Sequence, residues 1–135
     1  MAHTLTSEQL ARGWIQAWID WDMAWLNTYL APDFLHISPF GRLAGREHYL
    51  NTVAPLAAKS VQKLTIVSVI AGPDESAIWF ENHTPAGVIP SCDWLTIKNG
   101  TISQIHSFYD SAHVRDTLTS EEQSQLNTTS PPKSS

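Results

Sequence analysis

The chain has 135 residues, of which 42% are hydrophobic and 16% charged, and this composition indicates one globular domain with a real core. Eight basic against thirteen acidic residues give a net charge of −5, which argues against binding to nucleic acid. No apolar run is long enough to span a membrane, and the N-terminus lacks a signal-peptide pattern. The single cysteine, Cys92, excludes an internal disulfide. We therefore expect a cytoplasmic protein.

The first predicted element is a helix that runs from Ser7 to about Tyr29. Thr6 and Gln9 have the spacing of a capping box, in which each residue satisfies a backbone N–H at the start of the helix. Large apolar side chains then recur every three or four residues, on one helix face: Leu10, Trp14, Trp18, Trp21 and Trp25. Tryptophans at this spacing are usually core residues, and part of the stripe can also line an aromatic pocket. Pro32 ends the helix because it disfavours the helical conformation of the preceding residue.

A short strand and a second helix follow. The strand over residues 34–38 alternates, so that His36 and Ser38 share one face. After a turn-rich stretch that is predicted to be a loop, residues 46–58 are predicted to form a helix with Tyr49 on its inward side.

The next part of the chain is predicted to be β-structure. Runs rich in branched residues are separated by turn residues, over residues 61–70, 76–84, 88–98 and 101–109. Asn99-Gly100 joins the last two runs and is typical of a β-hairpin. We therefore expect a single α+β domain over residues 1–115, with a curved antiparallel sheet wrapped around the N-terminal helix to leave an apolar pocket. The polar residues 116–135 are predicted to form a partly disordered tail with a helical turn near 120–126.

Asp93 is the most informative single residue. If its strand alternates, Asp93 shares a face with three apolar residues: Ile89, Leu95 and Ile97. A carboxyl group on an apolar face must find a partner or keep its proton, because burial raises its pKa. A neutral carboxylic acid can donate a hydrogen bond to an oxygen that gains negative charge. The alternative is structural: a bulge turns Asp93 to solvent, or a salt bridge holds it ionised.

The sequence lacks the common motifs for metal, nucleotide or nucleophile chemistry. It has six histidines, but no two lie two or four residues apart, so a metal site would need ligands from separate strands. Nothing in the sequence places a base beside Cys92, which is therefore interpreted as an ordinary strand cysteine. We expect no metal ion and no cofactor.

Several short motifs resemble one superfamily. They are Leu-Ala-Pro-Asp-Phe (30–34), Leu-Ala-Gly-Arg-Glu (43–47) and the ending from Asn99 to Asp110. Together with the order of elements, they are similar to the cone-shaped α+β group of SnoaL-like polyketide cyclases, ketosteroid isomerases, limonene-epoxide hydrolases, scytalone dehydratase and nuclear transport factor two. The resemblance covers about residues 7–115. It implies a cone-shaped fold with a central pocket, and it is less specific for activity because this fold hosts many functions.

The resemblance to ketosteroid isomerases implies that some of their catalytic groups are kept and others lost. Their oxyanion tyrosine falls on Trp14, whose indole can donate a hydrogen bond but does not titrate. Their general-base aspartate falls on Ser38, which is no base, and their protonated oxyanion-hole aspartate falls on Asp93. The resemblance therefore implies that part of the oxyanion hole survives without the isomerase base.

The resemblance to limonene-epoxide hydrolases implies that their water-activating relay is missing. Their arginine–aspartate pair falls near Glu81 and His83, and their second aspartate falls on Ser107. A carboxylate common to SnoaL-like proteins falls on Asp110, where the resemblance allows either an acid/base role or a structural role at the exit of the last strand.

The superfamily also favours one face of each of two strands. Over residues 76–84 it favours one inward set over the other: Trp79, Glu81 and His83 rather than Ile78, Phe80 and Asn82. Over residues 101–109 it favours three residues and leaves His106 outward: Ile105, Ser107 and Tyr109. His36 and His83 are therefore predicted to be pocket residues.

The sequence and the resemblance together predict a cofactor-independent acid/base enzyme for a small apolar, oxygenated molecule, of the isomerase, cyclase or dehydratase type. His36 or His83 would act as the base, and Asp93, with Trp14, would donate hydrogen bonds to the substrate oxygen. The other expected substrate-site residues are Trp18, Ser38, Tyr49, Glu81, Ile105, Ser107 and Asp110. The alternative is a non-catalytic protein of the same fold that binds a small ligand or acts as a scaffold.

The resemblance also implies a homodimer. Members of the superfamily often pair through the outer face of the sheet, and Trp94 and Phe108 are predicted to supply apolar area there. Neither nucleic acid nor a membrane is an expected partner.

Overall fold

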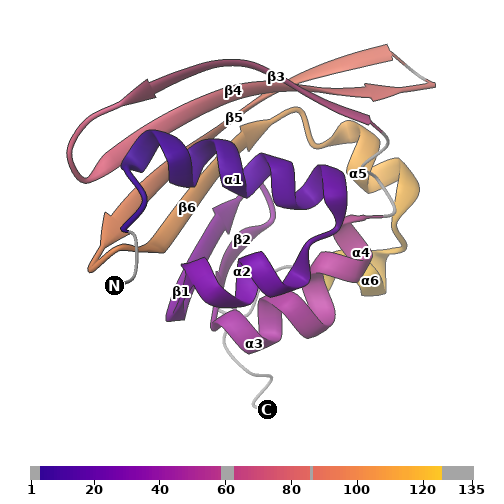
Figure 1. Cartoon of the computed structure of the whole chain (residues 1–135). Coiled ribbons are helices and arrows are strands. Elements are labelled where there is room, and N and C mark those ends of the chain that lie inside the picture. Colours follow the sequence, from indigo (N-terminus) through magenta and orange to yellow (C-terminus); the bar gives the residue numbers. More distant parts are fainter. Residues whose placement is uncertain (1–3, 59–62, 86, 126–135) are drawn as a thin grey trace.

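The computed structural model describes residues 4–58, 63–85 and 87–125 and shows one curved sheet with helices packed against it (Figure 1). The six strands are β1 Leu30–Ser38, β2 Gly41–Ala44, β3 Lys63–Ala71, β4 Glu75–Thr84, β5 Gly87–Lys98 and β6 Thr101–Tyr109. Their order across the sheet is β2-β1-β6-β5-β4-β3, with a parallel β1–β6 pair and antiparallel pairs elsewhere. The predicted α+β class and curved sheet are confirmed, although the sequence did not indicate the parallel pair.

The helices fall into three groups along the chain. They are α1 Ser7–Asp20 and α2 Met23–Tyr29, then α3 Arg46–His48, the π-helical turn η1 Tyr49–Val53 and α4 Ala54–Ala57, and finally α5 Ala112–Thr117 and α6 Ser120–Ser124. Figure 1 shows α1 lying across the long strands, with α2, α3 and α4 gathered below it. The helices thus cover the side of the sheet on which the core forms.

The predicted long N-terminal helix is in fact two helices. α1 begins with the expected capping box of Thr6 and Gln9. It ends at Trp21, which adopts the left-handed conformation with φ 54°, and Asp22 then caps α2 by accepting the Trp25 N–H at 3.0 Å. An aspartate that bonds the backbone competes with the helical ladder, which explains the break. The prediction that Trp21 shares the apolar face of one long helix was therefore wrong, and its side chain is 44% exposed.

The stretch expected to be a loop contains a strand. β2 pairs with β1 through a tight turn in which Gly41 has φ 122°, and Gly45 (φ 101°) ends the hairpin; both angles favour glycine. Pro32 does end the helical region, but it lies inside β1, where pairing with β6 is interrupted between Leu30 and Leu35. A residue without an N–H is tolerated at such an interruption.

The predicted second helix is confirmed as the continuous stretch α3, η1 and α4. Its wider π turn precedes Pro55, which has no N–H to donate to a regular helical ladder. Tyr49 and Val53 project from this turn into the protein and are each 2% exposed. The π turn therefore sets the position of Tyr49.

The pairing of β4 with β5 decides which face of β4 points inward. Ile78 lies opposite Asp93 and Phe80 opposite Ser91. Directly opposite residues of an antiparallel pair share a face, and Asp93 points inward. The inward set is therefore Ile78, Phe80 and Asn82, and the expected set of Trp79, Glu81 and His83 was wrong.

The hairpin between β5 and β6 is confirmed. Asn99 and Gly100 have φ 55° and 77°, as the predicted turn requires. A bulge between Thr96 and Ile97 then shifts the pairing by one residue, so that Asp93 lies opposite Ser107. The inward residues of β6 are the expected ones: Ile105, Ser107 and Tyr109.

The core lies between the helices and the sheet. Its fully buried members include Leu10, Leu26, Phe34, Leu43, Ile78, Leu95 and Ile102. Gly13 allows α2 to approach α1 closely, because a Cβ at this position would lie 2.2 Å from the Trp25 ring.

The segment after β6 folds back as α5 and α6. α6 lies within the predicted helical turn and carries its own capping box, formed by Thr119 and Glu122. Leu118, between the two helices, is 4% exposed and joins the core. The predicted, partly disordered tail covers residues 116–135, and of these residues 126–135 lie outside the described part of the chain.

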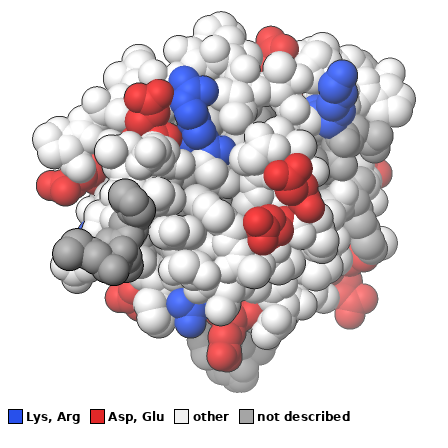
Figure 2. Space-filling model, viewed as in Figure 1, with Lys and Arg blue, Asp and Glu red and all other residues white. Residues whose placement is uncertain are grey.

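The outer surface is sparsely charged on the face shown in Figure 2. Lys and Arg stand apart from one another there rather than forming a basic patch, so this face does not resemble one that binds a nucleic-acid backbone. Within the described ranges, no helix has both the length and the apolar character needed to cross a membrane.

Candidate functional site

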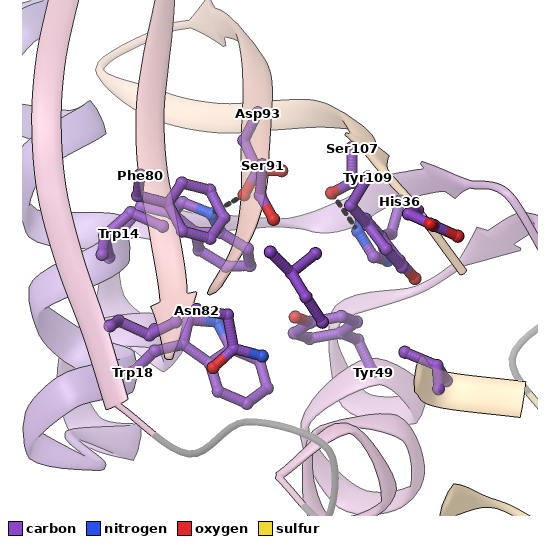
Figure 3. Close-up of a pocket in the computed structure, with 15 residues that line it drawn as sticks. Trp14, Trp18, His36, Tyr49, Phe80, Asn82, Ser91, Asp93, Ser107 and Tyr109 are labelled. Carbon is purple, nitrogen blue, oxygen red and sulfur yellow. Dashed lines mark hydrogen bonds between the residues drawn. The ribbon is translucent and has the colours of Figure 1, made fainter. Parts of the chain in front are cut away.

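A cavity of about 130 Å³ lies between α1, η1 and the inward faces of β4, β5 and β6 (Figure 3). Its apolar lining comprises Trp14, Ile15, Trp18, Leu64, Phe80, Ile89 and Val114. Its remaining lining residues carry polar atoms: His36, Tyr49, Asn82, Ser91, Asp93, Ser107, Tyr109 and Asp110. An apolar cavity with a few converging polar groups is typical of small-molecule sites, and a cavity of about 150 Å³ can hold benzene.

Asp93 is the buried carboxyl group of this cavity. It is 4% exposed, and Trp14 Nε1–H donates a hydrogen bond to its Oδ2 at 2.7 Å. Burial raises the pKa of Asp93 to about 6, while hydrogen bonds from Trp14 and Ser107 act in the opposite direction by favouring the charged form. The group therefore titrates close to neutrality and is mostly carboxylate above that pKa.

His36 is linked to Asp93 through Ser107. Its Nε2 lies 2.9 Å from Ser107 Oγ, and its ring packs against Phe34 and Tyr49, with centroid distances of 6.3 and 5.3 Å. Burial, with a smaller contribution from the charge of His106, lowers the pKa of His36 to about 4. The imidazole is therefore neutral at neutral pH.

Two tyrosines border the same space. Burial and the charge of Asp93 raise the pKa of Tyr49, whose hydroxyl also has a hydrogen bond with Trp18. The same two causes raise the pKa of Tyr109 to about 12, against the opposing effect of a hydrogen bond with Ser38. Both tyrosines therefore remain phenols across the ordinary pH range.

The structure gathers most of the predicted site residues around the cavity. Those that line it are Trp14, Trp18, His36, Tyr49, Asp93, Ser107 and Asp110. Ser38 contributes through its hydrogen bond with Tyr109, and Ile105 is fully buried in the core instead of lining the cavity.

Glu81 and His83 do not belong to the cavity lining. Because of the β4 register they point to the other face of the strand, where their side chains lie 3.5 Å apart and about a third exposed (34% and 37%). The expectation that they point into the pocket was wrong, and His83 is not placed to act as a base there.

Asp110 has a structural partner. Its Oδ1 accepts the Ala112 N–H at 3.0 Å, just where the chain leaves β6 for α5. This contact matches the structural alternative that the sequence left open, and Asp110 also reaches the rim of the cavity.

Sequence reasoning left several lining residues out of the site. Phe80 and Asn82 were placed on the wrong face of β4, because alternation fits either face and only the register with β5 distinguishes them. Ile89 and Tyr109 were placed inward without a role in the site. Leu64, Ser91 and Val114 carried no signal, and the helix that supplies Val114 was not predicted.

The cavity does not have the composition of a typical metal site. It offers one imidazole and two carboxyl groups, of which Asp110 is exposed and bonded to the backbone. In the described part of the chain, no three His, Cys, Asp or Glu side chains are grouped so that they could hold a metal ion.

Several solved structures share this fold. A candidate ketosteroid isomerase from Kribbella flavida matches with a TM-score of 0.68 and 20% identity, covering 82% of this chain and 84% of its own. A protein with a ketosteroid isomerase-like fold from Catenulispora acidiphila, described in complex with trimethylamine, matches with a TM-score of 0.64, 20% identity and coverages of 83% and 93%. A candidate polyketide cyclase from Pseudomonas putida matches with a TM-score of 0.65, 16% identity and coverages of 85% and 99%.

These similarities show the fold, because all three identities are below 25%. A search of curated proteins found no match. The family model for the SnoaL-like domain matches residues 11–105, from α1 into β6, and so includes most of the elements that build the cavity. The chain belongs to the SnoaL-like domain family.

Proposed function

We propose that this protein is an acid/base enzyme that isomerises or cyclises a small, largely apolar carbonyl compound in the cavity. The observation that carries this proposal is the buried Asp93 carboxyl group, which borders an aromatic cavity and has a pKa of about 6. A base that titrates near the working pH combines the correct protonation state with useful basicity. Fold neighbours named as candidate isomerases and cyclases support the same reaction class.

The hydrogen bonds of Asp93 favour a different role from the one the sequence suggested. The carboxyl group accepts from Trp14, so this indole N–H is already used and is not free to bind a substrate oxygen. Two donors aimed at Asp93 stabilise its carboxylate form, which accepts protons. We therefore assign the base to Asp93 rather than to His36, whose pKa of about 4 makes it weaker.

The reaction step follows from this assignment. The Asp93 carboxylate takes a proton from the carbon next to the substrate carbonyl. The C–H electron pair forms a carbon–carbon double bond, and the carbonyl π pair moves to the oxygen, giving an enolate. In a substrate with a β,γ double bond this enolate is a conjugated dienolate, and return of the proton to its γ-carbon shifts the double bond and completes an isomerisation. Attack of the enolate carbon on a second carbonyl, followed by protonation of the new alkoxide by Asp93, completes an aldol cyclisation.

Hydrogen–deuterium exchange tests this function without knowledge of the natural substrate. The wild-type protein in D₂O should accelerate exchange of the hydrogens next to the carbonyl of cyclohexanone or tetralone, followed by proton NMR. Asp93→Asn should lower the rate by at least about a hundredfold, the lower end expected for a lost general base. Asp33→Asn, on the exposed part of β1, is the matched control and should exchange like the wild type. Equal rates in the wild type and Asp93→Asn would refute the assignment.

A second candidate function is non-catalytic binding of a small amine. Aromatic rings together with a carboxylate favour a cationic ligand, and the Catenulispora neighbour is described in complex with trimethylamine. Calorimetric titration with tetramethylammonium and with uncharged neopentanol, which is similar in shape, tests this candidate. Clear preference for the cation, together with no ketone exchange, would favour binding over catalysis.

A further inference from the structure

We propose that the phenol hydroxyls of Tyr49 and Tyr109 form the donor pair that binds the substrate oxygen, across the cavity from Asp93. This inference rests on the proposed function and deepens it, because it names the groups that stabilise the enolate and so limits the substrate to a molecule with a neutral oxygen acceptor. Figure 3 shows both rings bordering the space that Asp93 also borders.

Tyr49 is held rigidly by its aromatic neighbours. Its ring centroid lies 6.0 Å from that of Trp14, 6.4 Å from that of Trp18 and 5.3 Å from those of Phe34 and His36. The Trp18 side chain forms a hydrogen bond with the Tyr49 hydroxyl. An indole N–H can only donate, so the phenol oxygen is the acceptor and its own proton remains to be donated elsewhere.

Tyr109 is oriented in a similar way from another element. Ser38 Oγ accepts the Phe40 N–H at 3.1 Å, and the Ser38 side chain forms a hydrogen bond with the Tyr109 hydroxyl that favours the phenolate. A bond that favours the phenolate is one in which the serine hydroxyl donates. Ser38 is therefore a positioning residue for Tyr109, and it is not one of the residues that line the cavity.

Two other donors near Asp93 are already used by Asp93 itself. Trp14 Nε1–H points at its Oδ2, and the Ser107 hydroxyl is its second hydrogen-bond partner. No Lys or Arg is among the residues that line the cavity. Ser91 also lines it, but a phenol is a more acidic donor than an aliphatic hydroxyl.

The electrostatics of the cavity couple the two tyrosines to the proton transfer. The negative charge of Asp93 raises the pKa of both phenols, which makes them weaker donors while the base is ionised. Once Asp93 has taken the substrate proton, that charge is gone from β5 and has appeared on the substrate oxygen. The phenols therefore become stronger donors when the enolate forms, which is the differential stabilisation that catalysis requires.

An oxyanion probe tests the donor pair directly. At about pH 5, where Asp93 with its pKa of about 6 is mostly protonated, the wild-type protein should bind 4-nitrophenol and raise its ionised fraction, seen as phenolate absorbance. Tyr49→Phe and Tyr109→Phe should each weaken binding on the order of tenfold, as expected for one hydrogen bond to a charged acceptor, and should reduce the phenolate signal. Nitrobenzene, which lacks the hydroxyl, should bind all of these proteins equally.

The matched control is Tyr29→Phe, because Tyr29 packs against Trp25 outside the cavity. The proposal is overturned if the wild type does not bind 4-nitrophenol, if neither cavity variant differs from Tyr29→Phe, or if both probes are lost equally, which would indicate packing alone. The proposed function can fail separately. If ketone exchange is absent while the cavity variants still weaken phenol binding, the donor pair stands and the role of Asp93 as a base falls.

Discussion

Asp93 and His36 are displaced from their ordinary pKa values in opposite directions, although they share Ser107 as a partner. Burial favours the neutral form of each group, which means a protonated carboxyl for Asp93 and an unprotonated imidazole for His36. The stability of the protein should therefore depend on pH through two contributions of opposite sign.

The signs follow from which state holds the proton more tightly. The pKa of Asp93 rises from 3.8 to about 6 on folding, so its contribution to stability falls as the pH rises through that window. The pKa of His36 falls from 6.5 to about 4, so its contribution rises with pH over nearly the same window. Each pKa shift corresponds to about 3 kcal/mol of unfolding free energy. In the wild type the two pH-dependent contributions largely cancel.

Single variants should separate the contributions of Asp93 and His36 to the unfolding free energy. Between about pH 4 and 6.5, we expect the unfolding free energy of Asp93→Asn to rise with pH relative to the wild type, and that of His36→Gln to fall, each by about 3 kcal/mol. Urea unfolding at a series of pH values measures this, with Asp33→Asn as a control that follows the wild type. Profiles of both variants that run parallel to the wild type would show that the burial effects are absent.

At this scale the sequence predicted the position of Asp93 better than its role. Its apolar strand neighbours were enough to place it inward, and the structure confirms that placement. Its preferred charge state depends on Trp14, which is 79 residues away, and on Ser107, which a strand bulge brings opposite it. Neither contact leaves a periodic signal in the sequence. The sequence alone therefore suggested that Asp93 donates a proton, and only the structure shows the hydrogen bonds that favour its role as a base.

Among the elements, the packing of α2 against α1 depends on one glycine. A Cβ at Gly13 would lie 2.2 Å from the Trp25 ring, which packs against Tyr29 with a centroid distance of 4.7 Å. Gly13→Ala gains about 1 kcal/mol of helix propensity but must displace the ring, and overpacking of this kind costs about 1–3 kcal/mol.

We therefore expect Gly13→Ala to unfold at a lower temperature than the wild type, by differential scanning calorimetry. Gly72→Ala is the control, because a Cβ there would meet only the Glu75 carbonyl oxygen at 3.8 Å. If Gly13→Ala were as stable as Gly72→Ala or more so, Trp25 would not pack as the structure shows.

The sequence predicted elements well wherever one local rule decided the outcome. Asn99-Gly100 fixed a hairpin, and Thr6 with Gln9 fixed a helix start. Prediction from the sequence failed where two local rules favoured different structures. The stripe through Trp21 favoured a continuous helix, but the Asp22 side chain captured a backbone N–H and ended it. For β4, alternation fits either face equally, and only the register with β5 distinguishes them.

For the whole molecule, the outer face of the sheet carries an apolar patch of three large residues. Trp79, Trp94 and Phe108 are 48%, 46% and 50% exposed, and they lie on neighbouring strands β4, β5 and β6. Aromatic residues are enriched at the centres of protein interfaces, and contiguous apolar surface of this kind marks association sites. We propose that this outer sheet patch pairs two copies of the chain.

Sedimentation at roughly tens of micromolar, above the roughly micromolar dissociation constant of a moderate interface, tests the pairing. The wild type should sediment as a dimer and Phe108→Glu as a monomer of 15.0 kDa. Ile19→Glu changes an apolar residue that is also exposed, at 44%, but lies on α1, which covers the opposite side of the sheet, and it should leave the dimer intact. A wild-type monomer at this concentration would refute the proposed dimer and would leave the cavity chemistry unaffected.

The fold alone does not determine the chemistry, since one cone-shaped scaffold hosts many activities. In the described part of this chain, the buried Asp93 carboxyl group borders an aromatic cavity together with two phenols. The proposed chemistry therefore depends on the charge state of that carboxyl group more than on any feature of the sheet or the helices.

The titration of the Asp93 carboxyl carbon, followed by carbon-13 NMR in the free protein and assigned by its loss in Asp93→Asn, measures that charge state directly. The account predicts a single-site titration with a pKa of about 6, well above the ordinary value of about 4 for an aspartate. A midpoint at or below about 4 would mean an ordinary carboxylate, and it would contradict the role of Asp93 as the base of this cavity.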